Sequence, residues 1–163
     1  MDLPLGVPLQ QSLKTANVDM LNTILELMKK QFTGYIVVTI NGYDGIEEGA
    51  ILFRKGVIIG AGYEFMKYGV TIEGNDAFKI VLNAFKAKHG VIDIYSLTTQ
   101  HMDLLTAFHE KMLISLKIEP KNLKKIYPRE FSDRYAKDVI KQQEEVTKYD
   151  IFKRAGIAGI TER

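Results

Sequence analysis

The 163-residue chain contains no cysteine. This absence excludes disulfide bonds, a thiol nucleophile and thiolate zinc sites, and it suits a reducing cytoplasm. No apolar run in the sequence approaches the ~20 residues of a membrane-spanning helix. The first eight residues lack the basic segment of a signal peptide, and their two prolines and one glycine predict an irregular arm on the surface. We therefore expect a cytoplasmic protein that does not enter a membrane.

The motifs of common catalytic and ligand-binding sites are also lacking. The glycine-rich stretch 55–62 does not have the residue order of a P-loop, and Phe65 stands where a dinucleotide-binding turn needs glycine. His101 and His109 are expected on one helix face about 12 Å apart, which is too far for them to share a zinc ion. We interpret His109 as a buried, hydrogen-bonded histidine, because it falls on the apolar stripe of its helix.

The acidic pair Glu47 and Glu48 is the remaining candidate for acid–base chemistry. Adjacent residues of an extended segment point to opposite sides, so the two carboxylates cannot easily share a proton or a water molecule. We interpret them as charges that keep a hairpin edge soluble. The sequence thus predicts a protein that is not an enzyme, with no cofactor and no metal.

What the sequence does contain is a clear pattern of strands and helices. Its apolar fraction of 46% is enough for a core. Turn signals at residues 41–45, which contain an Asn-Gly pair, and at Lys55-Gly56 separate segments rich in β-branched and aromatic residues, which predicts an antiparallel meander. Strands are expected at 35–40, 50–54, 57–63 and 91–96, and a loop at 65–73. Helices are expected from Asn17 to Lys30, at 75–89, at 99–116, at Pro120, from Ser132 or Asp133, and from Thr147 to Gly156.

This pattern predicts an α+β fold. A small antiparallel sheet, made of the meander plus one strand, would be flanked by the first three helices. Residues 1–116 would form the core domain, and residues 117–163 a helical extension packed on it.

Two residues of the third expected strand, Gly60 and Gly62, point to one face of the sheet and leave a shallow groove. The groove could be filled by a helix of the same chain or by a side chain of a partner protein. Four aromatic residues are further partner-binding candidates, namely Tyr43 at the hairpin tip and the cluster of Tyr63, Phe65 and Tyr68. The cluster could equally cap the core under the following loop.

The extension is basic. From Lys117 onward there are 12 Lys and Arg against 8 Asp and Glu. Such a segment could bind nucleic acid or an acidic partner, or it could simply be a solvated helix surface. The residues that would contact nucleic acid are Lys117, Lys121, Lys124, Lys125, Arg129 and Arg134.

Several short motifs resemble those of an uncharacterised archaeal family of cytoplasmic proteins, a domain of unknown function. They are FTGYI (32–36), EEGAILF (47–53), GVIIGA (56–61), GNDA (74–77), GVIDIY (90–95), AFHEK (107–111) and DIFKRAGI (150–157). The core at 32–95 is similar, more distantly, to the PATAN-type domain of bacterial response regulators. This resemblance implies a protein-interaction module without catalysis that works in signalling, in some cases with small Ras-like GTPases.

We therefore expect an intracellular protein-interaction or regulatory module whose partner is a protein. Two alternatives stay open. One is nucleic-acid binding through the basic extension, and the other is a homo-oligomeric structural protein, such as a homodimer, built on the apolar stripes of the terminal helices.

Overall fold

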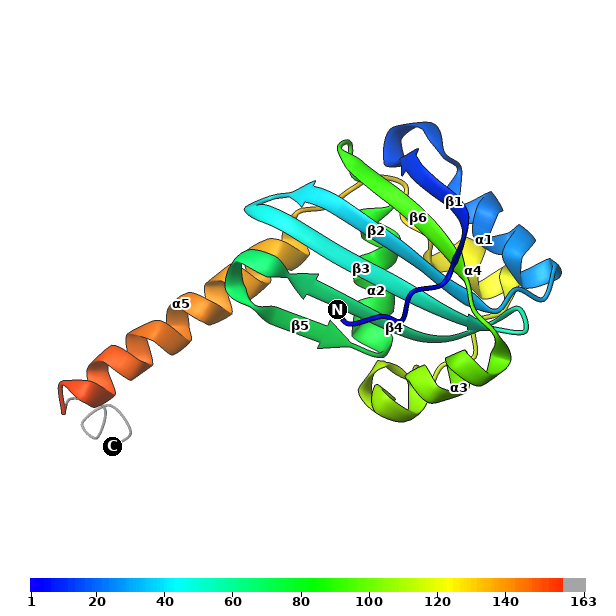
Figure 1. Ribbon diagram of the computed structural model, residues 1–163. Coiled ribbons are helices and arrows are strands. Elements are labelled where there is room, and N and C mark those ends of the chain that lie inside the picture. Colours follow the sequence, from blue (N-terminus) through cyan, green and yellow to red (C-terminus); the bar gives the residue numbers. More distant parts are fainter. Residues whose placement is uncertain (157–163) are drawn as a thin grey trace.

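The computed structural model describes residues 1–156 of the chain. Its strands are β1 (Val7–Lys14), β2 (Gly34–Gly42), β3 (Gly45–Arg54), β4 (Val57–Phe65), β5 (Val70–Glu73) and β6 (Gly90–Ser96). They form a six-stranded antiparallel sheet in the order β1-β6-β2-β3-β4-β5 (Figure 1). The predicted α+β fold is confirmed, and the predicted meander is the β2-β3-β4 centre of this sheet.

The two tight turns of the meander follow from their residues. Tyr43 and Asp44 connect β2 to β3, with Gly42 and Gly45 paired on either side. Between β3 and β4, Lys55 has a φ of 49° and Gly56 a φ of 79°. Two successive left-handed residues make the kind of turn that matches the twist of a hairpin.

The sequence analysis predicts neither of the two edge strands, β1 and β5. Strand β1 begins within the first eight residues, which were expected to be an irregular arm, and only residues 1–6 are irregular. Strand β5 lies within residues 65–73, which were expected to be a loop. Every residue of β1 except Leu13 is exposed, so this strand lacks the alternation on which such a prediction depends. Strand β5 has only four residues.

The helices are α1 (Met20–Lys29), α2 (Asn75–Ala84), α3 (Thr99–Phe108), α4 (Pro120–Ile126) and α5 (Arg134–Arg154), with short 3-10 turns η1 (Thr15–Asn17), η2 (Met66–Tyr68) and η3 (Glu110–Met112). The N-cap of α1 is Asp19 rather than Asn17, because the Asp19 carboxylate accepts a hydrogen bond from the backbone N–H of Asn22. The predicted helix start at Thr147 is wrong. The Thr147 hydroxyl donates to the Gln143 carbonyl inside one continuous helix.

One face of the sheet packs on α1, α2 and α4 and forms the larger core. Alternate residues of β2, among them Ile36 and Val38, meet Phe78 and Val81 of α2 there. The segment beyond residue 116 joins this core through Leu123 of α4 and through the first turns of α5. Residues 157–163 of the expected extension lie outside the described residues. No helix within residues 1–156 combines the length and the apolar character needed to cross a bilayer.

The opposite face of the sheet carries the N-terminal arm (residues 1–6) and α3 (Figure 1). These segments form a second, smaller core with the sheet. Its buried members are Tyr35, Leu52, Leu97, Met102, Leu105 and Met112, and Met1 and Leu3 of the arm pack against them.

The expected groove at Gly60 and Gly62 is occupied by groups of the chain itself. A Cβ atom at Gly60 would lie 3.0 Å from a methyl carbon of Leu52 and 3.1 Å from the backbone oxygen of Met112. A Cβ atom at Gly62 would lie 2.8 Å from the sulfur of Met1. The two glycines therefore allow the arm and η3 to approach β4 closely.

We expect the substitution Gly60→Val to destabilise the protein by about 1–3 kcal/mol, because it would overpack a filled site. Urea unfolding measures this change. Thr71→Val on the exposed surface of β5 is the control and should leave the free energy of unfolding nearly unchanged. Unchanged stability of the Gly60 variant would show that the space above Gly60 is open.

Candidate functional site

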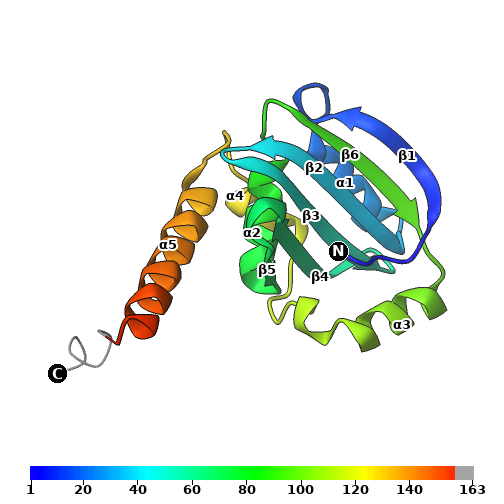
Figure 2. The same ribbon diagram turned by 60° about the vertical axis from the view of Figure 1, so that its left-hand side comes forward.

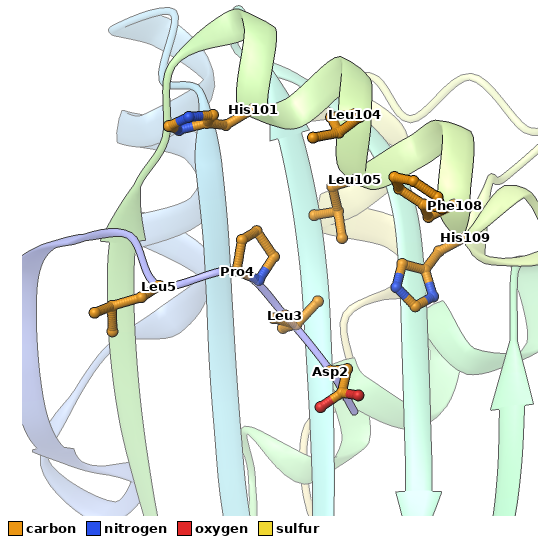
Figure 3. A pocket seen from close by; sticks show the side chains of 9 residues that line it. All are labelled: Asp2, Leu3, Pro4, Leu5, His101, Leu104, Leu105, Phe108 and His109. Carbon is orange, nitrogen blue, oxygen red and sulfur yellow. The ribbon is translucent and has the colours of Figure 1, made fainter.

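An apolar groove of about 550 Å³ lies between the arm and α3 and is here called the arm–α3 groove (Figure 3). It is lined by Asp2, Leu3, Pro4 and Leu5 from the arm and by His101, Leu104, Leu105, Phe108 and His109 from α3 and its C-terminal end. Its size is within the range of ligand and peptide sites.

Helix α3 presents two rows of side chains to this groove, each with the four-residue spacing of one helix face. Leu105 lies in the row between His101 and His109 and is buried in the smaller core. Leu104 and Phe108 form the second row and are 57% and 77% exposed. In Figure 3 the two histidines lie near opposite ends of the groove.

The prediction that His109 is buried is wrong. Helix α3 ends at Phe108, and the His109 backbone leaves helical geometry with a φ of −125°. As a result the His109 ring is half-buried and lines the groove. Within residues 1–156, no three His, Cys, Asp or Glu side chains are grouped so that they could hold a metal ion.

The arm is fastened at several points along its length. The Met1 ammonium lies 2.9 Å from Glu64 Oε2 and 3.7 Å from Glu48 Oε1. The Tyr35 hydroxyl donates a hydrogen bond of 2.8 Å to the Pro4 carbonyl. These contacts hold one wall of the groove in place, and the hydrogen bond from the ammonium to Glu64 raises the pKa of the Met1 amino group.

Both groove walls carry exposed apolar side chains, namely Leu5 on the arm and Leu104 and Phe108 on α3. Leu5 of the arm is 93% exposed, and Val7 and Leu9 at the start of β1 are exposed too. Single exposed apolar residues are ordinary, but several large ones around one concavity mark a binding surface. The sequence gives a weak signal for this surface, because Leu104 is a large apolar residue that lies outside the apolar stripe of its helix.

The structure brings Tyr63 and Phe65 together, but the predicted partner-binding residues do not share one exposed surface. Tyr63 and Phe65 are buried in the larger core, with their ring centroids 5.1 Å apart in an edge-to-face contact. Tyr43 is 54% exposed and lies under the Lys137 ammonium of α5. The partly buried Tyr68 donates a hydrogen bond to Asp44. None of these residues lines the arm–α3 groove.

Glu47 and Glu48 do point to opposite faces of the sheet, but their interpretation as solvated edge charges is wrong. Glu47 is 5% exposed, and its Oε2 accepts a hydrogen bond of 2.6 Å from the Tyr63 hydroxyl. Its Oε1 is buried without a hydrogen-bond partner. Burial raises the pKa of the Glu47 carboxyl. Glu48 instead contributes to holding the Met1 ammonium.

The six basic residues predicted to contact nucleic acid are exposed. Lys117 lies 3.4 Å from Glu119, and the Arg134 guanidinium lies over the Tyr135 ring at 5.0 Å. The others are on α4 or just beyond it. Their role in binding nucleic acid stays a prediction.

The architecture defines the class of this protein, an α+β domain with a six-stranded antiparallel sheet whose second face is partly covered by an N-terminal arm. The chain belongs to the family described as "Uncharacterized protein conserved in archaea (DUF2226)", which matches residues 1–109. Comparisons with curated proteins and with solved structures gave no match. All nine residues of the arm–α3 groove are within the matched part. The similarity of residues 32–95 to PATAN-type domains stays a prediction.

We expect Glu64→Gln to weaken the attachment of the arm in a pH-dependent way. The raised pKa of the Met1 ammonium means that its stabilising contribution is present below the ordinary value of 8.0 and is lost as the pH rises through the raised value. The variant should be less stable by about 1 kcal/mol at pH 7, allowing for solvent screening. Thermal unfolding from pH 6 to pH 10 measures the difference, with exposed Glu130→Gln as control. A difference that did not shrink at high pH would contradict this role of the ammonium.

We expect Glu47→Gln to stabilise the protein at neutral pH, because the amide keeps an acceptor for Tyr63 and removes a charge that burial disfavours. A raised carboxyl pKa in the folded state lowers stability as the pH rises from the ordinary value of 4.5 through the raised value. The advantage of the variant should therefore vanish below pH 4.5. Urea unfolding at pH 4 and pH 7 tests this, and a variant that is less stable at pH 7 would refute it.

Proposed function

We propose that the chain is a non-catalytic protein-interaction module that binds a partner chain in the arm–α3 groove. The observation that carries this proposal is the exposure of large apolar side chains on both walls of one concavity. Leu5 on one wall and Phe108 on the other are 93% and 77% exposed. Covering such side chains removes apolar surface from water, which is the main favourable term in protein association.

A partner chain fits this surface better than a small molecule does. Small-molecule sites enclose most of their ligand, whereas the walls of this groove stand out into solvent. Interfaces typically combine an apolar centre with a polar rim. The groove has this arrangement, with Leu104 and Leu105 in the middle, Phe108 between them and His109, and His101, His109 and Asp2 toward its ends (Figure 3).

A regulatory role in an intracellular signalling system is the more specific form of the proposal. It is supported by the resemblance of residues 32–95 to PATAN-type domains, and it would make a signalling protein or small GTPase the partner. The groove does not depend on this resemblance, because its residues lie outside 32–95.

We expect Phe108→Glu to weaken partner binding at least about 30-fold, the loss typical of a central apolar contact. The wild-type chain and the variant would be immobilised and exposed to a lysate of the organism that encodes them. The control is Leu116→Glu, which changes an exposed apolar residue outside the groove. The partner should be recovered by the wild type and the control, and lost with Phe108→Glu.

The lysate would be tested with and without nuclease, at low and moderate salt. Equal recovery by all three chains would contradict binding in the groove. A partner that disappears on nuclease treatment would favour the basic extension, because phosphate contacts weaken steeply with salt. Circular dichroism of the variants shows that the fold is kept.

A further inference from the structure

A second surface lies where the connection between α4 and α5, residues 127–133, packs against α2. The connection is yellow to orange in Figure 2 and passes alongside this helix. Asn83 of α2, which is 5% exposed, holds it in place. The Asn83 amide donates a hydrogen bond of 2.9 Å to the Ser132 carbonyl, and its oxygen accepts one of 2.8 Å from the Ser132 backbone N–H. The surface that the two segments form is therefore fixed by the fold.

Two hollows lie along this junction, with volumes of about 530 and 300 Å³. Tyr127 lines the first, and its neighbours Ile126 and Pro128 line the second, so the two hollows adjoin at this residue. Two acidic residues, Asp19 and Glu130, are among the lining side chains. They are outnumbered by four exposed basic residues, here called the basic surface, which are Lys79, Lys86, Lys88 and Arg134.

The charges of the basic surface are available to an anion. In the part of the chain that the structure describes, none of its four cations forms an ion pair with an acidic side chain. Asp19, one of the two acids, is engaged in capping α1. Three more exposed cations, Lys124, Lys125 and Arg129, lie within three residues of Tyr127 in the chain. An anionic partner therefore meets an excess of positive charge here.

Two of the cations lie over tyrosine rings. The Lys86 ammonium is 5.3 Å from the centre of the Tyr127 ring, and the Arg134 guanidinium is 5.0 Å from that of Tyr135. Both tyrosines line the hollows. Proteins that bind single-stranded nucleic acids combine aromatic rings, on which bases stack, with cations that contact the phosphates. The sequence does not reveal this combination, because Lys86 and Tyr127 are far apart in the chain.

The extent of the basic surface suits several phosphates rather than one. Lys79 and Lys86 are two helix turns apart on the α2 side, which is about 10 Å along the helix. Arg134 lies across the second hollow from α2, beyond the connection. Cations spread in this way match a chain of phosphates better than a single small anion.

We propose that the basic surface binds a single-stranded nucleic acid. Its phosphates contact Lys79, Lys86, Lys88 and Arg134, and its bases lie against Tyr127 and Tyr135. This inference goes beyond the proposed function, because no residue of the arm–α3 groove takes part. It also differs from the sequence prediction, since Arg134 alone among the six predicted residues lines the hollows. Contacts to phosphates and to base faces carry no sequence information, so the binding is independent of base sequence.

Fluorescence anisotropy of a labelled ten-nucleotide oligouridine measures this binding on the full chain. With about four phosphate contacts, the affinity should fall about 50-fold between 50 and 200 mM salt. The double variant Lys86→Ala and Lys88→Ala should bind more weakly and roughly halve the slope of log affinity against log salt, because two contacts are lost. The matched control, Lys55→Ala with Lys148→Ala, removes the same charge at exposed positions outside both hollows and should bind as the wild type does.

Several results would overturn the proposal. One is a wild-type chain that does not bind the oligonucleotide at 50 mM salt, and another is an equal loss of affinity in the control. Equal or tighter binding of polyglutamate would indicate an acidic protein partner instead, and equal or tighter binding of an RNA duplex of the same length would exclude stacking of bases on the tyrosines. Circular dichroism shows that the variants keep the fold.

The groove variant Phe108→Glu separates this proposal from the proposed function. It should bind the oligonucleotide as tightly as the wild type, because Phe108 lines neither of the two hollows. Loss of oligonucleotide binding in this variant would place the strand in the arm–α3 groove and overturn the basic surface as its site.

Discussion

The face of the sheet that carries the groove depends on two missing side chains, those of Gly60 and Gly62 in β4. Because neither glycine has a Cβ atom, the Met112 backbone and the Met1 sulfur can lie close to the strand. An added Cβ atom would be 3.1 Å from the Met112 oxygen at Gly60 and 2.8 Å from the Met1 sulfur at Gly62. The other face of the same strand carries Ala61, Tyr63 and Phe65 in the larger core. One strand thus has a bulky side for the helices and a flat side for an extended arm. Because the arm is a single extended segment, α3 lies beside it and the groove is formed between the two.

The alternation of side chains along β3 gives two neighbouring carboxylates different environments. Glu47 faces the helices, where the Tyr63 hydroxyl reaches it and water does not. Glu48 faces the arm, where the Met1 ammonium lies within reach. A carboxylate on the first face costs stability when it is charged, and one on the second face gains from a cation. The two-residue period of a strand is enough to produce this contrast.

The parts of the fold that the sequence predicted are those fixed by local rules. The turn at Lys55-Gly56 and the apolar stripes of α1 and α2 depend on residues close together in the chain. Strand β1 depends on pairing with β6, which lies about half the chain away. The register of this β1–β6 pairing also shifts along the strand. The groove could not be predicted from the sequence for the same reason. It joins residues 2–5 to residues 101–109, and no short-range pattern connects them.

The arm–α3 groove and helix α5 belong to different parts of the chain. The groove lies wholly within residues 1–109, which match the family, whereas α5 lies wholly outside that match. The fold of the matched part is therefore sufficient to form the arm–α3 groove. The groove therefore does not depend on α5, because the contacts that hold the arm against β3 and β4 come from within the matched part.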